Sequence, residues 1–177
     1  MLLDILVLSF IIALIRGGRP APFDVKRPSL VILAVALQVA AIFVPHLVSQ
    51  SFILLSYVAL AAGLISNSER TSMRLILVGV LLNVIVIAAN YGRMPVSLSA
   101  AAHVGVNIAP LVSNTDFKRV AMSDDTRFNF LGDVIFVPYP LRRVVSLGDI
   151  VIAVGAFTLV QEFMSRPITF RVRRLSL

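Results

Sequence analysis

The chain has 177 residues, of which 58% are hydrophobic and 14% charged, and its mean hydropathy is +0.94. Soluble domains are typically about 45–50% apolar and about 25% charged, so this composition excludes an ordinary soluble domain and also a disordered chain. It predicts an integral membrane protein. The net charge of +7 would suggest nucleic-acid binding in a soluble protein, but its distribution along this chain predicts membrane orientation and no nucleic-acid partner.

Five apolar segments predict an all-α membrane protein, with five transmembrane helices in a single membrane domain. A helix needs roughly 20 residues to cross the hydrocarbon core, and several of these segments reach that length only with flanking residues. The expected spans cover residues 2–15, 29–48, 52–66, 73–89 and 147–163.

The basic residues predict that the N-terminus lies outside and the C-terminus inside, because cytoplasmic loops carry an excess of Lys and Arg. The segments expected on the cytoplasmic side hold 10 of the 16 basic residues but 3 of the 9 acidic residues. The arginines at these ends can also contact anionic lipid headgroups on the cytoplasmic face. We expect this contact for Arg16, Arg19, Arg171, Arg173 and Arg174.

Residues 90–146 are expected to form an ordered cap on the outer face of the membrane, between the fourth and fifth helices. Connections longer than about 15 residues are uncommon in compact proteins, and this segment contains aromatic residues that need packing partners. Ser97 resembles the N-cap of a short interfacial helix near 97–107. Pro138 and Pro140 predict an extended connector further along.

Two Leu-Gly-Asp sequences make Asp133 and Asp149 the weak candidates for catalysis. Asp149 would lie one turn into the fifth span, where an ionisable group is costly and often functional. In one interpretation the pair is a carboxylate dyad that activates water. In the other, Asp149 stabilises the start of its helix, and Asp133 caps a turn or pairs with an arginine. The arginines considered for that pairing are Arg93, Arg127, Arg142 and Arg143.

His46 and His103 are the weak candidates for binding a cofactor such as haem or a pigment. Neither has a second ligand at helical spacing, so no metal site is predicted and the cofactor stays unknown. Gln38 and Asn83 are expected to form hydrogen bonds between helices. No phosphate-binding loop, nucleophile elbow or zinc motif occurs.

An ordered set of motifs resembles a bacterial family of small polytopic membrane proteins that is catalogued as a domain of unknown function. The resemblance implies a bacterial inner-membrane location and a similar five-span layout, and it implies no activity. The residues that carry it are Arg16, Gly17 and Gly18, then Asn90, Gly92, Met94, Pro95 and Val96, then Leu131, Gly132, Asp133, Pro138 and Pro140, and finally Ser146, Gly148, Asp149 and Gly155.

The sequence therefore favours a non-enzymatic accessory or scaffolding subunit that binds the lipid bilayer and other membrane-protein subunits. An outward-facing membrane hydrolase that uses Asp133 and Asp149 is the first alternative. A small transporter or cofactor carrier is the second, and it predicts a polar cavity near the midplane that contains Gln38 or Asn83.

Overall fold

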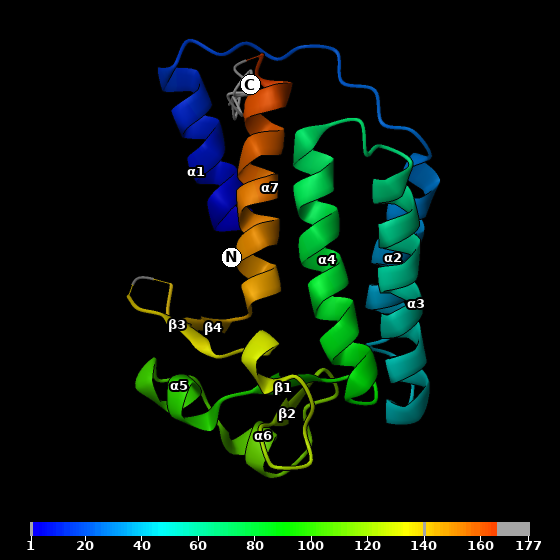
Figure 1. Cartoon of the computed structure of the whole chain (residues 1–177), viewed down its shortest axis with the longest axis vertical. Coiled ribbons are helices and arrows are strands. Elements are labelled where there is room, and N and C mark those ends of the chain that lie inside the picture. Colours follow the sequence, from blue (N-terminus) through cyan, green and yellow to red (C-terminus); the bar gives the residue numbers. More distant parts are fainter. Residues whose placement is uncertain (1, 140, 166–177) are drawn as a thin grey trace, which may run out of the picture.

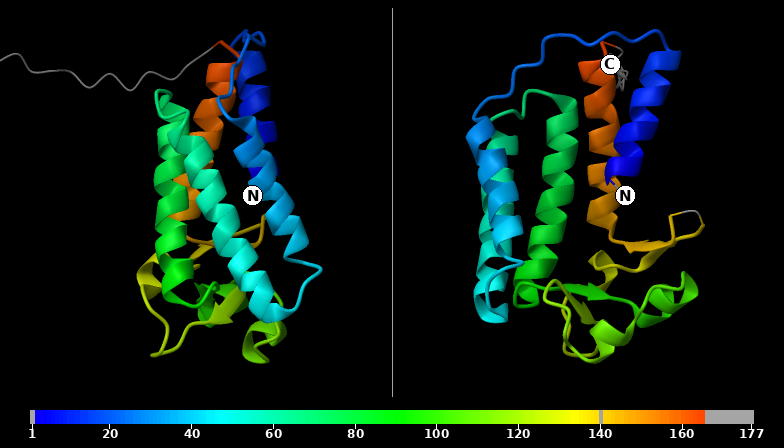
Figure 2. Two further views of the ribbon diagram at one scale, coloured as in Figure 1. Left: turned by 90° about the vertical axis from the view of Figure 1, so that its right-hand side faces the viewer. Right: turned by 180° about the vertical axis from the view of Figure 1, so that it is seen from behind.

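The computed structural model describes residues 2–139 and 141–165 and is mostly helical. Five helices lie side by side in the order α1, α7, α4, α3, α2, and the other elements form a cap at one end (Figures 1 and 2). The helices are α1 (Leu2–Ile15), α2 (Pro28–Ala40), α3 (His46–Ile65), α4 (Thr71–Ala89) and α7 (Leu147–Phe163). The cap comprises β1 (Met94–Val96), α5 (Leu98–His103), α6 (Ala109–Val112), β2 (Arg119–Ala121), the 3₁₀ helix η1 (Asn129–Leu131), β3 (Ile135–Val137) and β4 (Arg143–Val145).

The connection between α1 and α2 crosses the end of the bundle that is opposite the cap (Figure 1). The Gly17-Gly18 pair permits this path, since Gly17 has a φ of 72° and a Cβ at Gly18 would lie 2.7 Å from the Ala13 carbonyl oxygen. The Arg19 amide then donates to the Met164 carbonyl at 3.1 Å. The first segment therefore ends as a helix at Ile15, and the chain folds over the end of α7.

Three helix boundaries differ from the sequence prediction because of Pro45 and Gly105. The second span was expected to run to residue 48 and the third to begin at residue 52, but α2 ends at Ala40 and α3 begins at His46 with Pro45 as its N-cap. Proline lacks an amide hydrogen and suits the start of a helix. The cap helix expected over 97–107 ends at His103, and Gly105 then has a φ of 72°. Ser97 is its N-cap and accepts a hydrogen bond from the Ala100 amide.

The prediction of an all-α fold is confirmed only in part, because the chain is mostly helical but the cap contains two small β-sheets. Strands β1 and β2 are parallel, and Met94 pairs with Arg119. Strands β3 and β4 form an antiparallel hairpin, in which Ile135 pairs with Val145. The expected extended connector is therefore the turn of this hairpin, and the β-branched residues on both sides of it favour strands. Pro140 lies outside the described residues.

The five expected spans are only partly supported by helix length. Two helical segments, Val48–Ile65 and Thr71–Ala89, are long and apolar enough to cross a membrane. Helices α1 and α2 have 14 and 13 residues and α7 has 17, so each is shorter than the roughly 20 residues of a typical span. The structure therefore hints at membrane association through α3 and α4.

A buried apolar cluster joins the bundle to the cap. It brings together Ile53 of α3, Val86 and Ile87 of α4 and Met94 of β1, with Leu131 packed against it. Each fully buried side chain of this size contributes roughly 1.5–3 kcal/mol relative to exposure. The cluster packs the cap against α3 and α4, and the polar groups described next lie at this junction.

Candidate functional site

Helices α4 and α7 approach each other closely because glycines face the contact. A Cβ at Gly79 would lie 2.5 Å from the Gly148 carbonyl oxygen, and one at Gly155 would lie 2.7 Å from the Ile76 amide nitrogen. Larger side chains would force the helices apart, whereas small residues allow close backbone contact. This contact positions the first turn of α7 beside the cap-facing half of α4.

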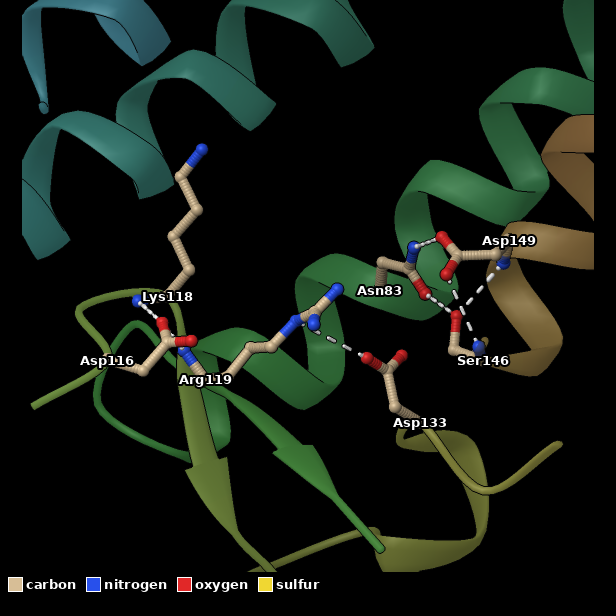
Figure 3. A network of polar contacts seen from close by, with 7 residues as sticks. All are labelled: Asn83, Asp116, Lys118, Arg119, Asp133, Ser146 and Asp149. Atoms are coloured by element: carbon tan, nitrogen blue, oxygen red, sulfur yellow. Dashed lines mark hydrogen bonds and ion pairs between the residues drawn. The ribbon is translucent and has the colours of Figure 1, made fainter. Parts of the chain in front are cut away.

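Ser146 and Asp149 form a capping box at the start of α7 (Figure 3). The Asp149 amide donates to Ser146 Oγ at 3.0 Å, and the Ser146 amide donates to Asp149 Oδ2 at 3.3 Å. A capping box satisfies amides that would otherwise lack a partner at the helix start. Asp149 therefore has the structural role that one of the two sequence interpretations gave it.

Asn83 of α4 connects this capping box to the neighbouring helix. Its Nδ2 donates to Asp149 Oδ1 at 2.9 Å, and Ser146 Oγ donates to its Oδ1 at 2.8 Å. Asn83 and Ser146 are both buried. Since a Cβ at Gly148 would overlap the Asn83 amide, glycine is required there. Asn83 thus forms the expected interhelical hydrogen bonds.

The backbone of Asp133 lies alongside β1. Its amide donates to the Pro95 carbonyl at 2.9 Å, and the Ser97 amide donates to the Asp133 carbonyl at the same distance. Gly132 permits this approach, because a Cβ there would lie 2.6 Å from the Pro95 carbonyl oxygen. The prolines and glycines of the motifs therefore hold Asp133 at a fixed place under the bundle.

The Asp133 side chain points from the cap toward the bundle and is only 6% exposed (Figure 3). Arg119 of β2 is its ion-pair partner, with Nε 3.8 Å from Oδ2, so the pairing expected with Arg93, Arg127, Arg142 or Arg143 is wrong. Burial is the main reason why the pKa of Asp133 rises from 3.8 to about 7, the charge of Asp149 adds to the rise, and Arg119 opposes it. Asp133 therefore changes its protonation state near neutral pH.

Asp133 and Asp149 share one cavity of about 210 Å³ between the bundle and the cap, which we term the cap cavity. Its apolar lining includes Ile53, Ile87 and Met94. Seven polar or charged residues also line it, from three helices, the cap and the start of α7. They are Gln38, Tyr57, Asn83, Lys118, Arg119, Asp133 and Asp149.

The cap cavity contains both Gln38 and Asn83, as the transporter hypothesis predicts, and it extends from the cap into the bundle. Asn83 is six residues before the end of α4 at Ala89, which corresponds to about 9 Å along the helix axis. Polar and ionisable residues in an apolar bundle are costly and commonly functional. The arrangement can bind a small polar molecule at the boundary between the helices and the cap.

Asn90 and Gly92 stabilise the C-terminal end of α4 and the turn that follows it. Asn90 Nδ2 donates to the carbonyls of Val86 and Arg127, both at 2.8 Å, and the Arg127 amide donates to Asn90 Oδ1. Gly92 has a φ of 84° and packs against Gln50, whose Cβ would be 2.8 Å from an added Cβ. These two residues are structural and position the wall of the cap cavity.

Among the described side chains, three of the sequence candidates, His103, Arg16 and Arg19, do not line the cap cavity. The exposed ring of His103 packs on Phe136, with 4.9 Å between ring centroids. Arg16 Nη1 donates to Gln161 Oε1 at 2.7 Å at the opposite end of the bundle, where exposed Arg19 also lies. The side chain of His46 and residues Arg171, Arg173 and Arg174 lie outside the described part of the chain. No group of three potential metal ligands occurs within the described residues.

Sequence reasoning missed Tyr57, Lys118 and Arg119 as site residues. Tyr57 interrupts an apolar helix with a hydroxyl group, and Lys118 is one of only two lysines in the chain. Both were available signals. Their convergence depends on the pairing of β1 with β2, which the all-α prediction did not include.

Comparisons with known proteins identify a family without an assigned activity. Residues 22–161 match the model of a family of unknown function, DUF5317. An uncharacterized protein of Thermotoga maritima is 25% identical over 174 residues, which cover 94% of this chain and 96% of that protein. No solved structure matches the chain. The family match confirms the resemblance to a domain of unknown function.

Proposed function

Because the chain belongs to the DUF5317 family, whose function is unknown, we propose its function from the geometry: it is a membrane protein that binds a small polar solute at its outer face. The observation that carries this proposal is the cap cavity. Seven of its lining residues are polar or charged, although the helices around it are apolar. Polar groups converging in a cavity are the usual mark of a ligand site.

In this proposal all five helices cross the bacterial inner membrane, with the N-terminus outside, the C-terminus inside and the cap outside. Apolar side chains are also exposed on the helices that are shorter than a typical membrane span, for example Leu8 on α1 and Ile32 on α2. Such residues suit lipid contact, and short helices are accommodated when the bilayer thins or flanking residues extend the span. Arg16 and Arg19 follow the end of α1, and Arg70 precedes α4, at the helix ends that lie away from the cap (Figure 1). The positive-inside rule supports a cytoplasmic position for this end.

Cysteine labelling tests this orientation, since the natural chain contains no cysteine. Asp125→Cys in the cap and Glu69→Cys between α3 and α4 each introduce one exposed thiol. In intact cells, a membrane-impermeant maleimide should label the cap cysteine and should label residue 69 only after the cells are opened. Equal labelling of both positions in intact cells would overturn the five-span orientation.

Solute binding is tested by the melting temperature of the purified protein in detergent. A ligand that binds only the folded state increases the free energy of unfolding, by about 2.7 kcal/mol at a concentration of 100 times its Kd. The melting temperature rises as a result. The panel contains small cations, anions, zwitterions and neutral polyols. At least one class should raise the melting temperature, and no shift with any class would contradict the proposal.

Binding accounts for the geometry better than aspartate-dependent hydrolysis does. Both carboxylate oxygens of Asp149 already accept hydrogen bonds, from Asn83 and from the Ser146 amide. A general base must be free to accept a proton from the attacking water. Asp149 is engaged in holding α7 to α4, which leaves Asp133 without the second carboxylate that a dyad requires.

A role as an accessory or scaffolding subunit is the second candidate, and exposed aromatic residues on the cap favour it. Tyr91 is 81% exposed and Phe130 is 72% exposed, and the rings of Phe128 and Phe130 are in edge-to-face contact. Exposed aromatics of this kind are typical of protein-binding surfaces. Gentle detergent extraction followed by size analysis should reveal a complex, and a Phe130→Ser variant should lose the partner. A monodisperse monomer for the natural protein would count against this role.

A further inference from the structure

Four polar groups on the wall of the cap cavity have unused hydrogen-bonding capacity. Within residues 2–139 and 141–165, the Gln38 amide, the Tyr57 hydroxyl, the Lys118 ammonium group and the Asp133 carboxylate form no side-chain hydrogen bond with the protein. By contrast, Asn83 and Asp149 in the same cavity are fully engaged with each other and with Ser146. The cavity therefore has a structural side and a side that is open to a ligand.

Asp133 calls for a ligand that donates hydrogen bonds. Its side chain is 6% exposed, and its ion pair with Arg119 is long at 3.8 Å. A buried carboxylate without hydrogen bonds is unfavourable, and a protonated amine supplies both donors and the opposite charge. The negative charge of nearby Asp149 favours the same cation.

Lys118 is an exposed lining residue of the cap cavity, and its ammonium group can pair there with an acidic group of the same ligand. Its side chain extends from the cap toward α3, away from Arg119 (Figure 3). Among the described residues no carboxylate lies within ion-pair distance of its ammonium group, whose neighbour is the Phe117 ring at 5.3 Å. A simple cation would meet repulsion from Lys118 and Arg119, and a simple anion would meet repulsion from Asp133 and Asp149.

We propose that the cap cavity binds a small zwitterion, a molecule with a protonated primary amine and an acidic group, with the amine on Asp133 and the acidic group on Lys118. This inference rests on the proposed solute binding and names the class of solute. The volume of about 210 Å³ is below the ~300–1,000 Å³ of pockets for drug-sized ligands. It suits a free amino acid or the phosphoethanolamine part of a lipid headgroup.

Calorimetric titration of the full chain in detergent tests the inference. The probes are glycine and phosphoethanolamine as zwitterions, ethanolamine as a cation, acetate as an anion and glycerol as a neutral solute. Asp133→Asn removes one charge with little change in shape, and Lys118→Gln removes the other. Asp125→Asn is the matched control, because Asp125 is an exposed carboxylate on the same cap. Melting curves verify that each variant is folded.

A zwitterion should bind the natural protein more tightly than any other probe. Asp133→Asn should weaken zwitterion binding at least tenfold, as should Lys118→Gln, whereas Asp125→Asn should leave it unchanged. Lys118→Gln should not weaken the binding of ethanolamine, which lacks the acidic group. This selective loss would not follow from a general structural defect.

The possible failures are distinguishable. Binding of glycerol or acetate without binding of any zwitterion would overturn the inference and preserve the proposed function, as would zwitterion binding that neither variant weakens. Absence of binding by every probe would overturn both. To separate the two sources of the ligand, glycine titrations are repeated in nanodiscs. Competition by phosphatidylethanolamine discs, but not by phosphatidylglycerol discs, identifies the headgroup as the occupant, and equal binding in both identifies a free solute.

Discussion

Side-chain hydrogen bonds join α4 to α7 at both ends of the pair, but the polar groups near these bonds differ between the two ends. At the end away from the cap, Glu162 of α7 accepts hydrogen bonds from the Ser72 hydroxyl at 2.6 Å and from the Ser72 amide at 3.3 Å. At the cap end, Asn83 of α4 binds Asp149 and Ser146 of α7. In both cases a carboxylate of α7 completes the capping of a helix start.

The difference lies in the neighbouring polar groups. At the end away from the cap, the Lys26 amide donates to Asn67 Oδ1 at 2.8 Å, and Asn67 Nδ2 donates to the Lys26 carbonyl at 2.9 Å. These bonds hold the connection between α1 and α2 against the end of α3. At the cap end, the polar groups of the cap cavity include Asp133 and Lys118 without hydrogen-bond partners for their side chains within the described residues. Because Asn83, Ser146 and Asp149 already join α4 to α7, we interpret the other polar groups that line the cap cavity as functional.

The largest effect is expected from the helix contact that supports the cap end. Gly148→Ala places a methyl group where the Asn83 amide and the Gly79 carbonyl already lie. Overpacking of this kind costs typically 1–3 kcal/mol and occasionally more, and we expect about 3 kcal/mol or more because backbone atoms must move. Thermal or denaturant unfolding measures the loss. The control is Gly63→Ala, where the nearest contact of a Cβ is an ordinary 3.4 Å, and an equal loss in this control would refute the close α4–α7 contact.

The pH dependence of stability should be set partly by Asp133. Its pKa is about 7 in the folded protein, against 3.8 ordinarily, so the folded state holds a proton that the unfolded state has released. Stability from this group is therefore present at low pH and is lost as the pH rises through about 7. Between pH 5.5 and 8.5 the expected decrease is about 2 kcal/mol.

Unfolding free energies of the natural protein and Asp133→Asn at both pH values measure this contribution. The variant should show a smaller decrease, because its amide does not titrate. The same decrease in both proteins would exclude Asp133 as the cause and would weaken the distinction between the two ends.

The serines at the two ends allow the comparison to be tested directly. Ser146→Ala and Ser72→Ala each remove the hydroxyl that fastens α4 to α7, and loss of such a group typically costs about 1 kcal/mol. Both variants should lose similar stability, but Ser146→Ala alone should also weaken ligand binding, because its partners line the cap cavity. Equal binding defects in the two variants would contradict the assignment of function to one end.

The smallest effect is expected for the exposed ion pair between Lys26 and Glu69. Their charged atoms are 3.0 Å apart and both side chains are more than half exposed, so water and salt screen the attraction. A Glu69→Gln variant should unfold at the same temperature as the natural protein within error. A clear decrease in the melting temperature would mean that this ion pair, at the end of the bundle away from the cap, contributes more to stability than its exposure predicts.

The features that could be predicted from the sequence depend on neighbouring residues. Ser146 three residues before Asp149 indicates the start of α7, Gly17-Gly18 indicates the end of α1, and Ser97 indicates the short cap helix. Each of these signals acts within one turn of a helix, where capping rules apply. Helix starts near Pro45 were predicted less well, because the apolar residues on both sides of it could extend either helix.

The features that could not be predicted depend on distant pairing. Arg119 reaches Asp133 because β1 pairs with β2 and Asp133 lies alongside β1, and no local pattern specifies that arrangement. The cap cavity likewise combines Gln38, Tyr57 and Asn83 from three helices. The sequence indicates each polar residue separately, whereas their meeting follows from tertiary packing.

A structure determined with a bound zwitterion tests the central claim most directly. The account predicts ligand density in the cap cavity, with an amine nitrogen within hydrogen-bond distance of the Asp133 carboxylate and an acidic oxygen beside Lys118. Density at another surface, or a ligand in the cavity that contacts neither residue, would contradict it.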